Sequence, residues 1–310
     1  MVTVTKIESY KNYGKCVSIS NGKIEALVTI DLGPRIIFFG FKGGQNFMCT
    51  DREGLGFDNK GNYEEFFGKG RKWESFGGHR IWVSPESFPE TYTPDDKAVK
   101  YEVTENGARF IPEEDVEVNF AKTLEIKMSD DDYTMQVDMA VKNTAETPRD
   151  FSVWSLSVCA AGGTMIIPTN TNDTGLLPNR IVSVWPYTDM SDDRIYWGKK
   201  YVTVKQDVNA TEPIKLGFDL NCGTAYYVLG NEIFKKNYET KHPEARYPDG
   251  GCSFETYTNE TMLEFETLSE LKTVNKGEVN TLSEVWTVSK LPCEVDTKDD
   301  TSIENMIKNL

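Results

Sequence analysis

Two stretches that lie far apart along the chain carry the side chains best suited to proton transfer. Residues 77–86 read GGHRIWVSPE and contain His79, one of only two histidines in 310 residues. The other stretch contains Glu255, whose neighbours Phe254 and Tyr257 suggest a partly buried strand entrance. Burial raises the pKa of a carboxyl, and an imidazole exchanges protons near neutral pH. We therefore expect acid/base chemistry, with Glu255 as the base and His79 as the acid.

Both assignments have structural alternatives. Glu255 could be an exposed strand residue paired with a lysine, and His79 could cap a turn through local hydrogen bonds. His79 follows Gly77-Gly78, where the missing side chains allow a ligand to approach the backbone closely. The nearby carboxylates Glu264 and Glu266 alternate with apolar residues, which is the pattern of an outward strand face, and we expect them to be structural.

Several other side chains are candidates for binding a ligand with hydroxyl groups and apolar faces. The forked guanidinium of Arg80 suits hydroxyls or a carboxylate, and flat indole rings suit the C–H faces of a pyranose. Arg35 follows Gly33-Pro34 at a hairpin, and the second histidine lies in a loop rich in Pro and Gly. The binding residues expected from the sequence are Arg35, Arg80, Trp82, Glu86, Trp154, His242 and Tyr257.

Metal and nucleophile chemistry receives little support from the sequence. The two histidines are widely separated, the six cysteines form no CxxC pair, and no HExxH, GxSxG, P-loop or dinucleotide motif is present. The cysteines fit reduced thiols better than a disulfide framework or a zinc site. We expect no cofactor, with Asp95 and Asp96 the one local pair that could hold Ca²⁺.

Charge and hydropathy limit the partners. The chain has 49 acidic and 34 basic residues and a net charge of −15, which disfavours nucleic acid and anionic membrane surfaces. The first twenty residues lack the apolar segment of a signal peptide, and no run is long enough to span a bilayer. The sequence thus predicts a cytoplasmic protein, monomeric or homodimeric, whose partner is a small molecule.

The elements that must position these residues are strands. Short runs rich in Val, Ile, Thr, Tyr and Phe alternate with turn signals, which is typical of a sandwich or barrel. Only 300–310 predicts an amphipathic helix, a C-terminal clasp with apolar residues three and four positions apart. We expect one all-β domain over residues 1–310. The predicted strands are 24–30, 35–41, 98–104, 108–111, 121–127, 133–141, 151–158, 165–168, 180–185, 201–205, 214–220, 225–229, 233–238, 262–268 and 281–288.

Several segments together resemble the galactose-mutarotase-like superfamily, which includes aldose 1-epimerases and hexose-phosphate mutarotases. They are VTIDLGPRIIFFGFKGGQNFM, GGHRIWVSPE, VWSLSVCAAGGTMIIP, CSFETYTNETMLEFETLS and KGEVNTLSEVW. The resemblance runs from about residue 19 to residue 286 and is closest to a poorly characterised branch. It implies a β-supersandwich fold, with Glu255 at the position of the late catalytic glutamate. It also implies a proton-donating histidine in the central strand, where this chain has Trp154.

Three functions follow from these residues. The first is an aldose 1-epimerase-like mutarotase acting on a monosaccharide or sugar derivative by acid/base catalysis. The second is a carbohydrate-binding protein without turnover, which the missing central histidine favours. The third is an accessory domain of a sugar-processing assembly, with a shallow or filled cleft and with His79 and Glu255 far apart.

Overall fold

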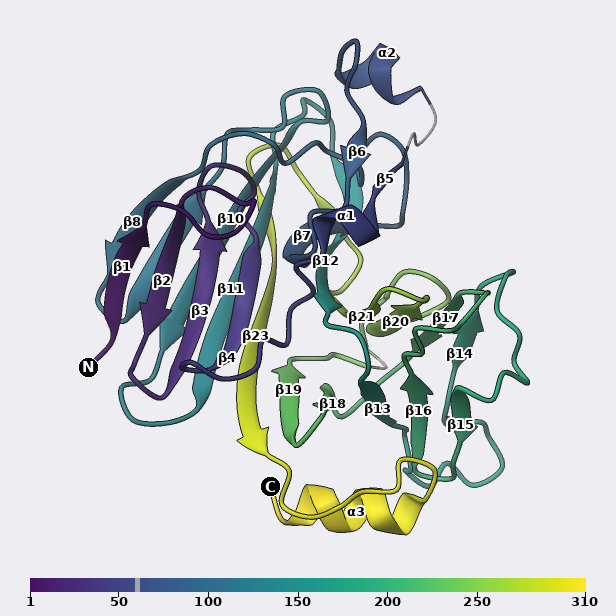
Figure 1. Ribbon diagram of the computed structural model, residues 1–310. Coiled ribbons are helices and arrows are strands. Elements are labelled where there is room, and N and C mark those ends of the chain that lie inside the picture. Colours follow the sequence, from purple (N-terminus) through teal and green to yellow (C-terminus); the bar gives the residue numbers. More distant parts are fainter. Residues whose placement is uncertain (59–61, 243) are drawn as a thin grey trace.

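The computed structural model describes residues 1–58, 62–242 and 244–310, and most of its regular structure is antiparallel β-sheet (Figure 1). The pattern of burial explains why these segments are strands. Along residues 120–128, for example, Leu124, Ile126 and Met128 are buried while the residues between them are partly exposed. This period of two lets one face of a strand join the core.

The first large sheet carries the candidate residues. Its main path has the spatial order β1-β2-β3-β4-β7-β12-β21-β20-β17-β14, and β22 pairs with β12 beside this path. Its strands are β1 (Thr3–Ile7), β2 (Cys16–Ser20), β3 (Ile24–Thr29), β4 (Ile36–Phe41), β7 (Gly78–Ser84), β12 (Arg149–Cys159), β21 (Leu263–Leu268), β20 (Phe254–Thr258), β17 (Ile214–Phe218), β14 (Val182–Val184) and β22 (Lys272–Val274).

The second large sheet packs against the first. Its spatial order is β15-β16-β13-β18-β19-β23-β11-β10-β9-β8. Its strands are β15 (Ile195–Trp197), β16 (Tyr201–Lys205), β13 (Thr164–Pro168), β18 (Thr224–Leu229), β19 (Glu232–Tyr238), β23 (Val279–Lys290), β11 (Thr134–Asn143), β10 (Phe120–Met128), β9 (Gly107–Ile111) and β8 (Lys100–Thr104).

The main core lies between the inner faces of the two sheets. Phe39 from the first sheet contacts Phe234 and Trp286 from the second, with ring centroids 5.2 Å apart in both pairs. Phe265 of β21 lies 5.2 Å from the same Phe234. These contacts leave the opposite face of the central strands β7, β12, β21, β20 and β17 to be covered by loops.

Part of that cover comes from the segment between β4 and β7. It contains the short helices α1 (Arg52–Leu55) and α2 (Tyr63–Phe67) and the two-stranded pair β5 (Phe57–Asp58) and β6 (Trp73–Glu74). Figure 1 shows this blue segment projecting above the central strands. The sequence-based strand predictions did not include these small elements.

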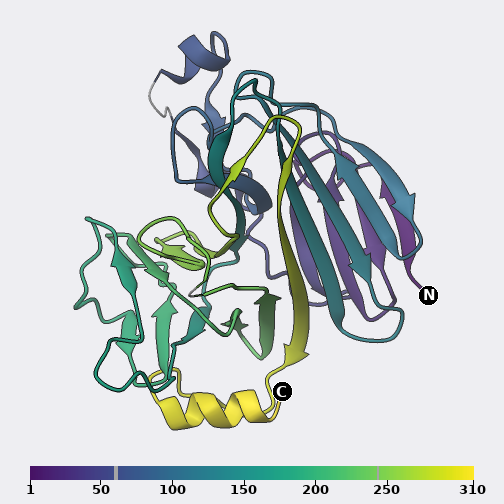
Figure 2. The same cartoon turned by 180° about the vertical axis from the view of Figure 1, so that it is seen from behind.

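The C-terminal helix α3 (Asp300–Lys308) confirms the predicted amphipathic segment. Ile303 and Met306 are fully buried against Ile166 and Tyr226, on the outer side of β13 and β18. Asp299 caps the helix by accepting hydrogen bonds from the first-turn N–H groups. Figure 2 shows the helix crossing the ends of these strands as a clasp. The fold is thus the predicted all-β sandwich with a short C-terminal helix.

Among the described residues, no helix has the length and apolar character needed to cross a membrane.

Candidate functional site

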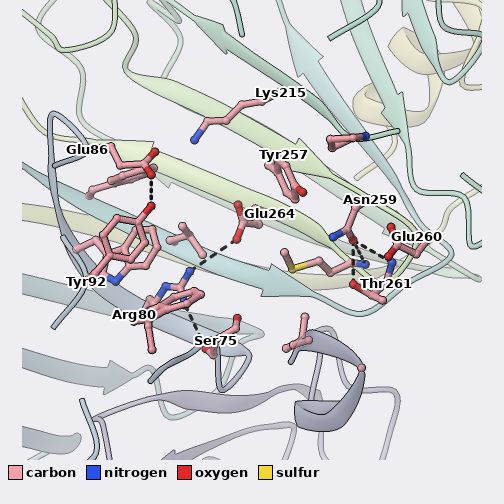
Figure 3. Close-up of a pocket in the computed structure, with 18 of the residues that line it drawn as sticks. Ser75, Arg80, Glu86, Tyr92, Lys215, Tyr257, Asn259, Glu260, Thr261 and Glu264 are labelled. Atoms are coloured by element: carbon pink, nitrogen blue, oxygen red, sulfur yellow. Dashed lines mark hydrogen bonds and ion pairs between the residues drawn. The ribbon is translucent and has the colours of Figure 1, made fainter. Parts of the chain in front are cut away.

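A cavity of about 490 Å³ lies over the loop-covered face of β7, β12, β21, β20 and β17 (Figure 3). Its floor comes from the strands, and its walls come from the α1–β6 segment, the β20–β21 turn and residues near 187 and 213. It is lined by Gly54, Leu55, Trp73, Ser75, Arg80, Trp82, Glu86, Tyr92, Trp154, Leu156, Tyr187, Pro213, Lys215, Tyr257, Asn259, Glu260, Thr261, Met262 and Glu264.

Strand register explains which side chains reach this cavity. Arg80 pairs with Leu156, and Trp82 pairs with Trp154, across β7 and β12. On the next hairpin, Tyr257 of β20 pairs with Glu264 of β21. Paired residues share a face of the sheet, so these chains converge. Five expected binding residues, Arg80, Trp82, Glu86, Trp154 and Tyr257, therefore line one cavity.

Arg80 lines one end of the cavity and is 2% exposed. Its Nη1 donates to the carbonyl of Ser75 at 3.1 Å, and its guanidinium lies 3.8 Å from the ring centre of Trp82 and 5.1 Å from that of Trp73. Burial, together with the charge of Arg35, lowers the pKa of Arg80 to about 9. Arg80 is thus a rigid, poorly hydrated cation facing the cavity.

Glu264 lies beside Arg80, with its Oε1 3.8 Å from Arg80 Nη2 (Figure 3). Its side chain is 10% exposed. Burial and the neighbouring Glu266 raise the pKa of Glu264 to about 8, against the opposing charges of Arg80 and Lys215. The expectation that Glu264 and Glu266 occupy an outward face is wrong, because loops cover that face. A carboxyl with a pKa near neutrality can donate and accept protons under ordinary conditions.

Lys215 supplies a second buried cation. Its Nζ lies 3.0 Å from Glu255 Oε2 and 3.3 Å from Glu266 Oε2, and 4.6 Å and 4.9 Å from the ring centres of Trp154 and Trp185. Burial lowers the pKa of Lys215, but the nearby carboxylates outweigh burial and raise it well above its ordinary value. The ammonium therefore stays charged and fixed.

Glu255 lies beneath this ammonium rather than in the cavity wall. It is 0% exposed and does not line the cavity. Burial raises the pKa of Glu255 well above its ordinary value, although Lys215 opposes the shift. The alternative that Glu255 is an exposed strand residue is wrong. The lysine partner that this alternative included is found, because Glu255 pairs with Lys215. In this geometry Glu255 holds Lys215 and does not itself reach the cavity.

His79 and Glu255 are not brought together. His79 pairs with Ser157 on one face of β7 and β12, whereas Glu255 pairs with Glu266 on the other face of the sheet. His79 lies between the sheets, with Nδ1 3.0 Å from Ser157 Oγ and its ring 5.0 Å from that of Trp286. Burial and nearby cations keep the pKa of His79 well below its ordinary value. The neutral ring therefore belongs to the core.

The glycines before His79 also serve the fold. Gly77 and Gly78 both have positive φ, and a Cβ on Gly77 would lie 2.4 Å from the carbonyl oxygen of Cys49. A Cβ on Gly78 would lie 2.6 Å from the carbonyl oxygen of Ile36. The close approach expected for a ligand is thus made by the protein's own backbone.

Arg35 lies behind the cavity and does not line it. Its Nη1 donates to the carbonyl of Ser75 at 3.2 Å, and its Nη2 contacts Asp95 Oδ2 at 3.1 Å. Arg35 and Arg80 therefore share the same carbonyl acceptor, and Arg35 supports Arg80 from behind. Asp95 is held by this arginine, and Asp96 pairs with Arg71. The two carboxylates expected to hold Ca²⁺ thus form ion pairs with arginine side chains instead. Among the described residues, no group of three or more His, Cys, Asp or Glu side chains is placed to hold a metal ion.

His242 lies at a separate depression. Its ring stacks on Tyr247 with centroids 4.2 Å apart, beside Asn170 and Arg180 rather than near Glu264. Both histidines of the chain are thus outside the main cavity. All six cysteines, which lie in the described part of the chain, are free.

Sequence reasoning undervalued several cavity residues. Glu264 is the main one, and the hairpin that contains Glu255 carried a signal for it. A tight turn near 259–261 pairs Glu255 with Glu266 and Tyr257 with Glu264, so all four side chains share one face. The aromatic residue Trp73 comes from the two-residue strand β6, and Tyr92 and Tyr187 come from loops, so no periodic pattern marks them.

Comparison with known proteins bears on the fold. No protein-family model and no curated protein matches the chain. Solved structures do match. A galactose mutarotase-like protein from Lactobacillus casei shares 12% identity with a TM-score of 0.55, covering 88% of this chain and 100% of that one. Another galactose mutarotase-like protein, from Clostridium acetobutylicum, shares 13% identity with a TM-score of 0.53, covering 94% of this chain and 98% of that one. A galactose mutarotase related enzyme from Lactobacillus acidophilus shares 9% identity with a TM-score of 0.51, covering 91% and 99%. The chain therefore has the galactose mutarotase-like fold.

Proposed function

We propose that this galactose mutarotase-like fold binds a monosaccharide or sugar derivative in the Arg80–Glu264 cavity and interconverts its anomers. The volume of about 490 Å³ lies within the range of small-molecule sites. Indole and phenol rings line its walls and suit the apolar faces of a pyranose. The observation that carries the proposal is Glu264, a cavity carboxyl with a pKa of about 8 beside a fixed arginine.

The proposed reaction needs one acid and one base at the anomeric centre. Protonated Glu264 donates its proton to the ring oxygen while the carboxylate of Glu86 removes the proton of the anomeric hydroxyl. The bond from the anomeric carbon to the ring oxygen breaks and an open-chain aldehyde forms. Rotation about the adjacent C–C bond and reclosure, with both protons returned, gives the other anomer.

The surroundings of these two carboxyls fit their proposed roles. Arg80 stabilises the negative charge that Glu264 acquires on losing its proton. Glu86 is exposed at the cavity rim, and its carboxylate accepts a hydrogen bond from the hydroxyl of Tyr92. Glu255 becomes a positioning residue for Lys215, and His79 has no role in proton transfer.

Carbohydrate binding without turnover is the second candidate. The observation that favours it is the absence of both histidines from the cavity, with Trp154 on the central strand. The accessory-domain function predicts a shallow or filled cleft with His79 and Glu255 far apart. His79 and Glu255 do lie on opposite faces of the sheet, but the open cavity disfavours this function. We also propose a cytoplasmic protein that is monomeric or homodimeric.

Exchange NMR on a panel of neutral, carboxylated and phosphorylated aldoses tests the proposal. Accelerated exchange between the anomers of any sugar supports a mutarotase. Saturation transfer to a sugar without acceleration supports the binding protein instead. If no sugar of the panel shows either accelerated exchange or saturation transfer, both functions are contradicted.

A further inference from the structure

Deepening this proposed function, we infer that Arg80 and Trp82 form a subsite for the carboxylate of an acidic sugar, so that the substrate class is a hexuronate. The inference rests on the proposal that the cavity binds a sugar. The carboxylate is the group on that sugar by which the cavity selects its substrate.

Four polar atoms at the Arg80 end of the cavity have no hydrogen-bond partner among the described residues. They are Arg80 Nε, Trp82 Nε1, Trp73 Nε1 and Ser75 Oγ, and all four are buried. Buried polar groups are nearly always paired, and an unpaired one costs stability. Their concentration along one cavity wall therefore indicates a ligand.

At the other end of the cavity, near Lys215, the indole nitrogen does have a hydrogen-bond acceptor. Trp154 Nε1 donates to Glu266 Oε2 at 2.8 Å. The unpaired indoles of the cavity are thus those of Trp82 and Trp73, whose ring centres lie 3.8 Å and 5.1 Å from the Arg80 guanidinium. At the Lys215 end the unpartnered atoms are carboxyl oxygens of Glu255 and Glu266, which are acceptors when ionised, so the unpaired nitrogen donors of the cavity are those at the arginine site.

Donor type selects the ligand group. The guanidinium and indole nitrogens can only donate, so the group they bind must offer several acceptor oxygens. A sugar hydroxyl brings one oxygen and a proton of its own that needs an acceptor. A carboxylate brings two acceptor oxygens in one plane and suits a guanidinium edge.

Charge balance favours a carboxylate over a phosphate. The ammonium of Lys215 lies within ion-pair distance of two glutamates, Glu255 at 3.0 Å and Glu266 at 3.3 Å. Among the described residues, Glu264 is the one carboxyl within ion-pair distance of the Arg80 guanidinium, at 3.8 Å, and its raised pKa leaves it mostly protonated at pH 7. At this end of the cavity the guanidinium beside a mostly protonated Glu264 matches a monoanion, whereas a phosphate ester would place a second negative charge near Glu264 and Glu86.

Calorimetric titration of the full chain tests the subsite. The ligands are D-galacturonate against D-galactose, D-glucuronate against D-glucose, and D-glucose 6-phosphate. We expect the wild type to bind at least one uronate about tenfold or more tightly than its neutral partner, as a charge-assisted hydrogen bond provides. Arg80→Lys, which keeps the charge and loses the fork, should reduce this preference severalfold.

A second variant keeps the test informative if Arg80→Lys does not fold. Trp82→Phe keeps an aromatic ring and removes the indole N–H, so it should also reduce the uronate preference. Trp197→Phe is the matched control, because Trp197 is exposed and its indole donates to Met190 outside the cavity. It should leave the preference unchanged.

The outcomes separate this inference from the proposed function. Neutral sugars bound as tightly as uronates, a preference for the phosphorylated sugar, or an unchanged preference in a folded variant would each overturn the carboxylate subsite. If anomer exchange of a neutral sugar persisted in those cases, the mutarotase proposal would stand. If no sugar of any class bound, both would fail.

Discussion

Arg80 Nη2 and Glu264 Oε1 lie 3.8 Å apart, although their strands β7 and β21 are separated in the sheet by β12. The distance is too long for a hydrogen bond but short enough for strong electrostatic coupling in a buried setting. Each group therefore influences the protonation of the other while both stay open to a ligand. The proposed chemistry depends on this relationship.

The first prediction is a pH dependence of anomer exchange. Glu264 acts as the acid only while protonated, so the rate should fall as pH rises through about 8. The titratable and charged groups that accompany it are Arg80 of β7, Glu266 of β21, Lys215 of β17, Tyr257 of β20 and Glu86 at the rim. Exchange rates measured between pH 5 and 10 provide the check. A rate that rises through pH 8 would contradict an acid role.

The same pKa has an independent consequence for stability. The native protein keeps a proton on Glu264 up to about pH 8, whereas an unfolded chain releases it near 4.5. Its contribution to the free energy of unfolding should therefore decline from pH 4.5 to 8. Glu264→Gln lacks this decline, so its Tm relative to wild type should rise over that interval. A constant difference in Tm would show that the pKa is not raised.

The second prediction concerns the buried Lys215. Lys215→Met leaves Glu255 and Glu266 without their cation, and breaking a buried pair costs about 3 kcal/mol or more. We expect a lower free energy of unfolding, measured by chemical denaturation. Glu255→Gln, which keeps the Lys215–Glu266 contact, should cost much less. Equal losses in the two variants would contradict the inferred pairing.

The third prediction separates packing from binding at Trp82. Its ring is 5% exposed and contacts Trp73, Tyr92 and Trp154. Trp82→Ala should therefore lower the free energy of unfolding by about 3 kcal/mol or more, as large-to-small core changes do. Trp82→Phe should retain most of the stability and show only the reduced preference for uronates. A thermal midpoint unchanged by Trp82→Ala would contradict the packing.

The fourth prediction concerns His79. Since its ring is buried between the sheets, His79→Gln should lower Tm while leaving the shape of the pH–rate profile unchanged in the folded variant. Ser157→Ala, which removes only the hydroxyl partner of the ring, provides a milder comparison. Loss of one limb of the pH–rate profile in His79→Gln would restore His79 as the acid.

Most strands were predictable from runs of β-branched and aromatic residues between turn signals, and the C-terminal helix from its apolar spacing, but β1, β2, β7, β15 and β22 were not among the predicted strands. Arg80 and Trp82 were predictable as binding residues from their chemistry, whereas β7 itself is buried on both faces and shows no alternation. His79 is adjacent to Arg80, so the two must point to opposite faces. Nothing local in the sequence says which face meets the other sheet.

Glu264 was misjudged for a tertiary reason. Alternation on β21 correctly separates Glu264 and Glu266 from Leu263 and Phe265. Whether the carboxyl face meets solvent depends on loops distant in sequence, including the segment that carries Trp73 and Ser75. Burial by those loops raises the pKa of Glu264, and such cover cannot be read from the strand itself.

The most direct measurement compares anomer exchange rates of Glu264→Gln and Glu260→Gln with the wild type by NMR. Both glutamates line the cavity, but Glu260 is exposed on the β20–β21 turn and serves as the matched control. Loss of a general acid reduces rates by about 10² or more. We expect that loss in Glu264→Gln with little change in sugar affinity, and a near wild-type rate in Glu260→Gln. Wild-type exchange in a folded Glu264→Gln protein would contradict the assignment of Glu264 as the acid.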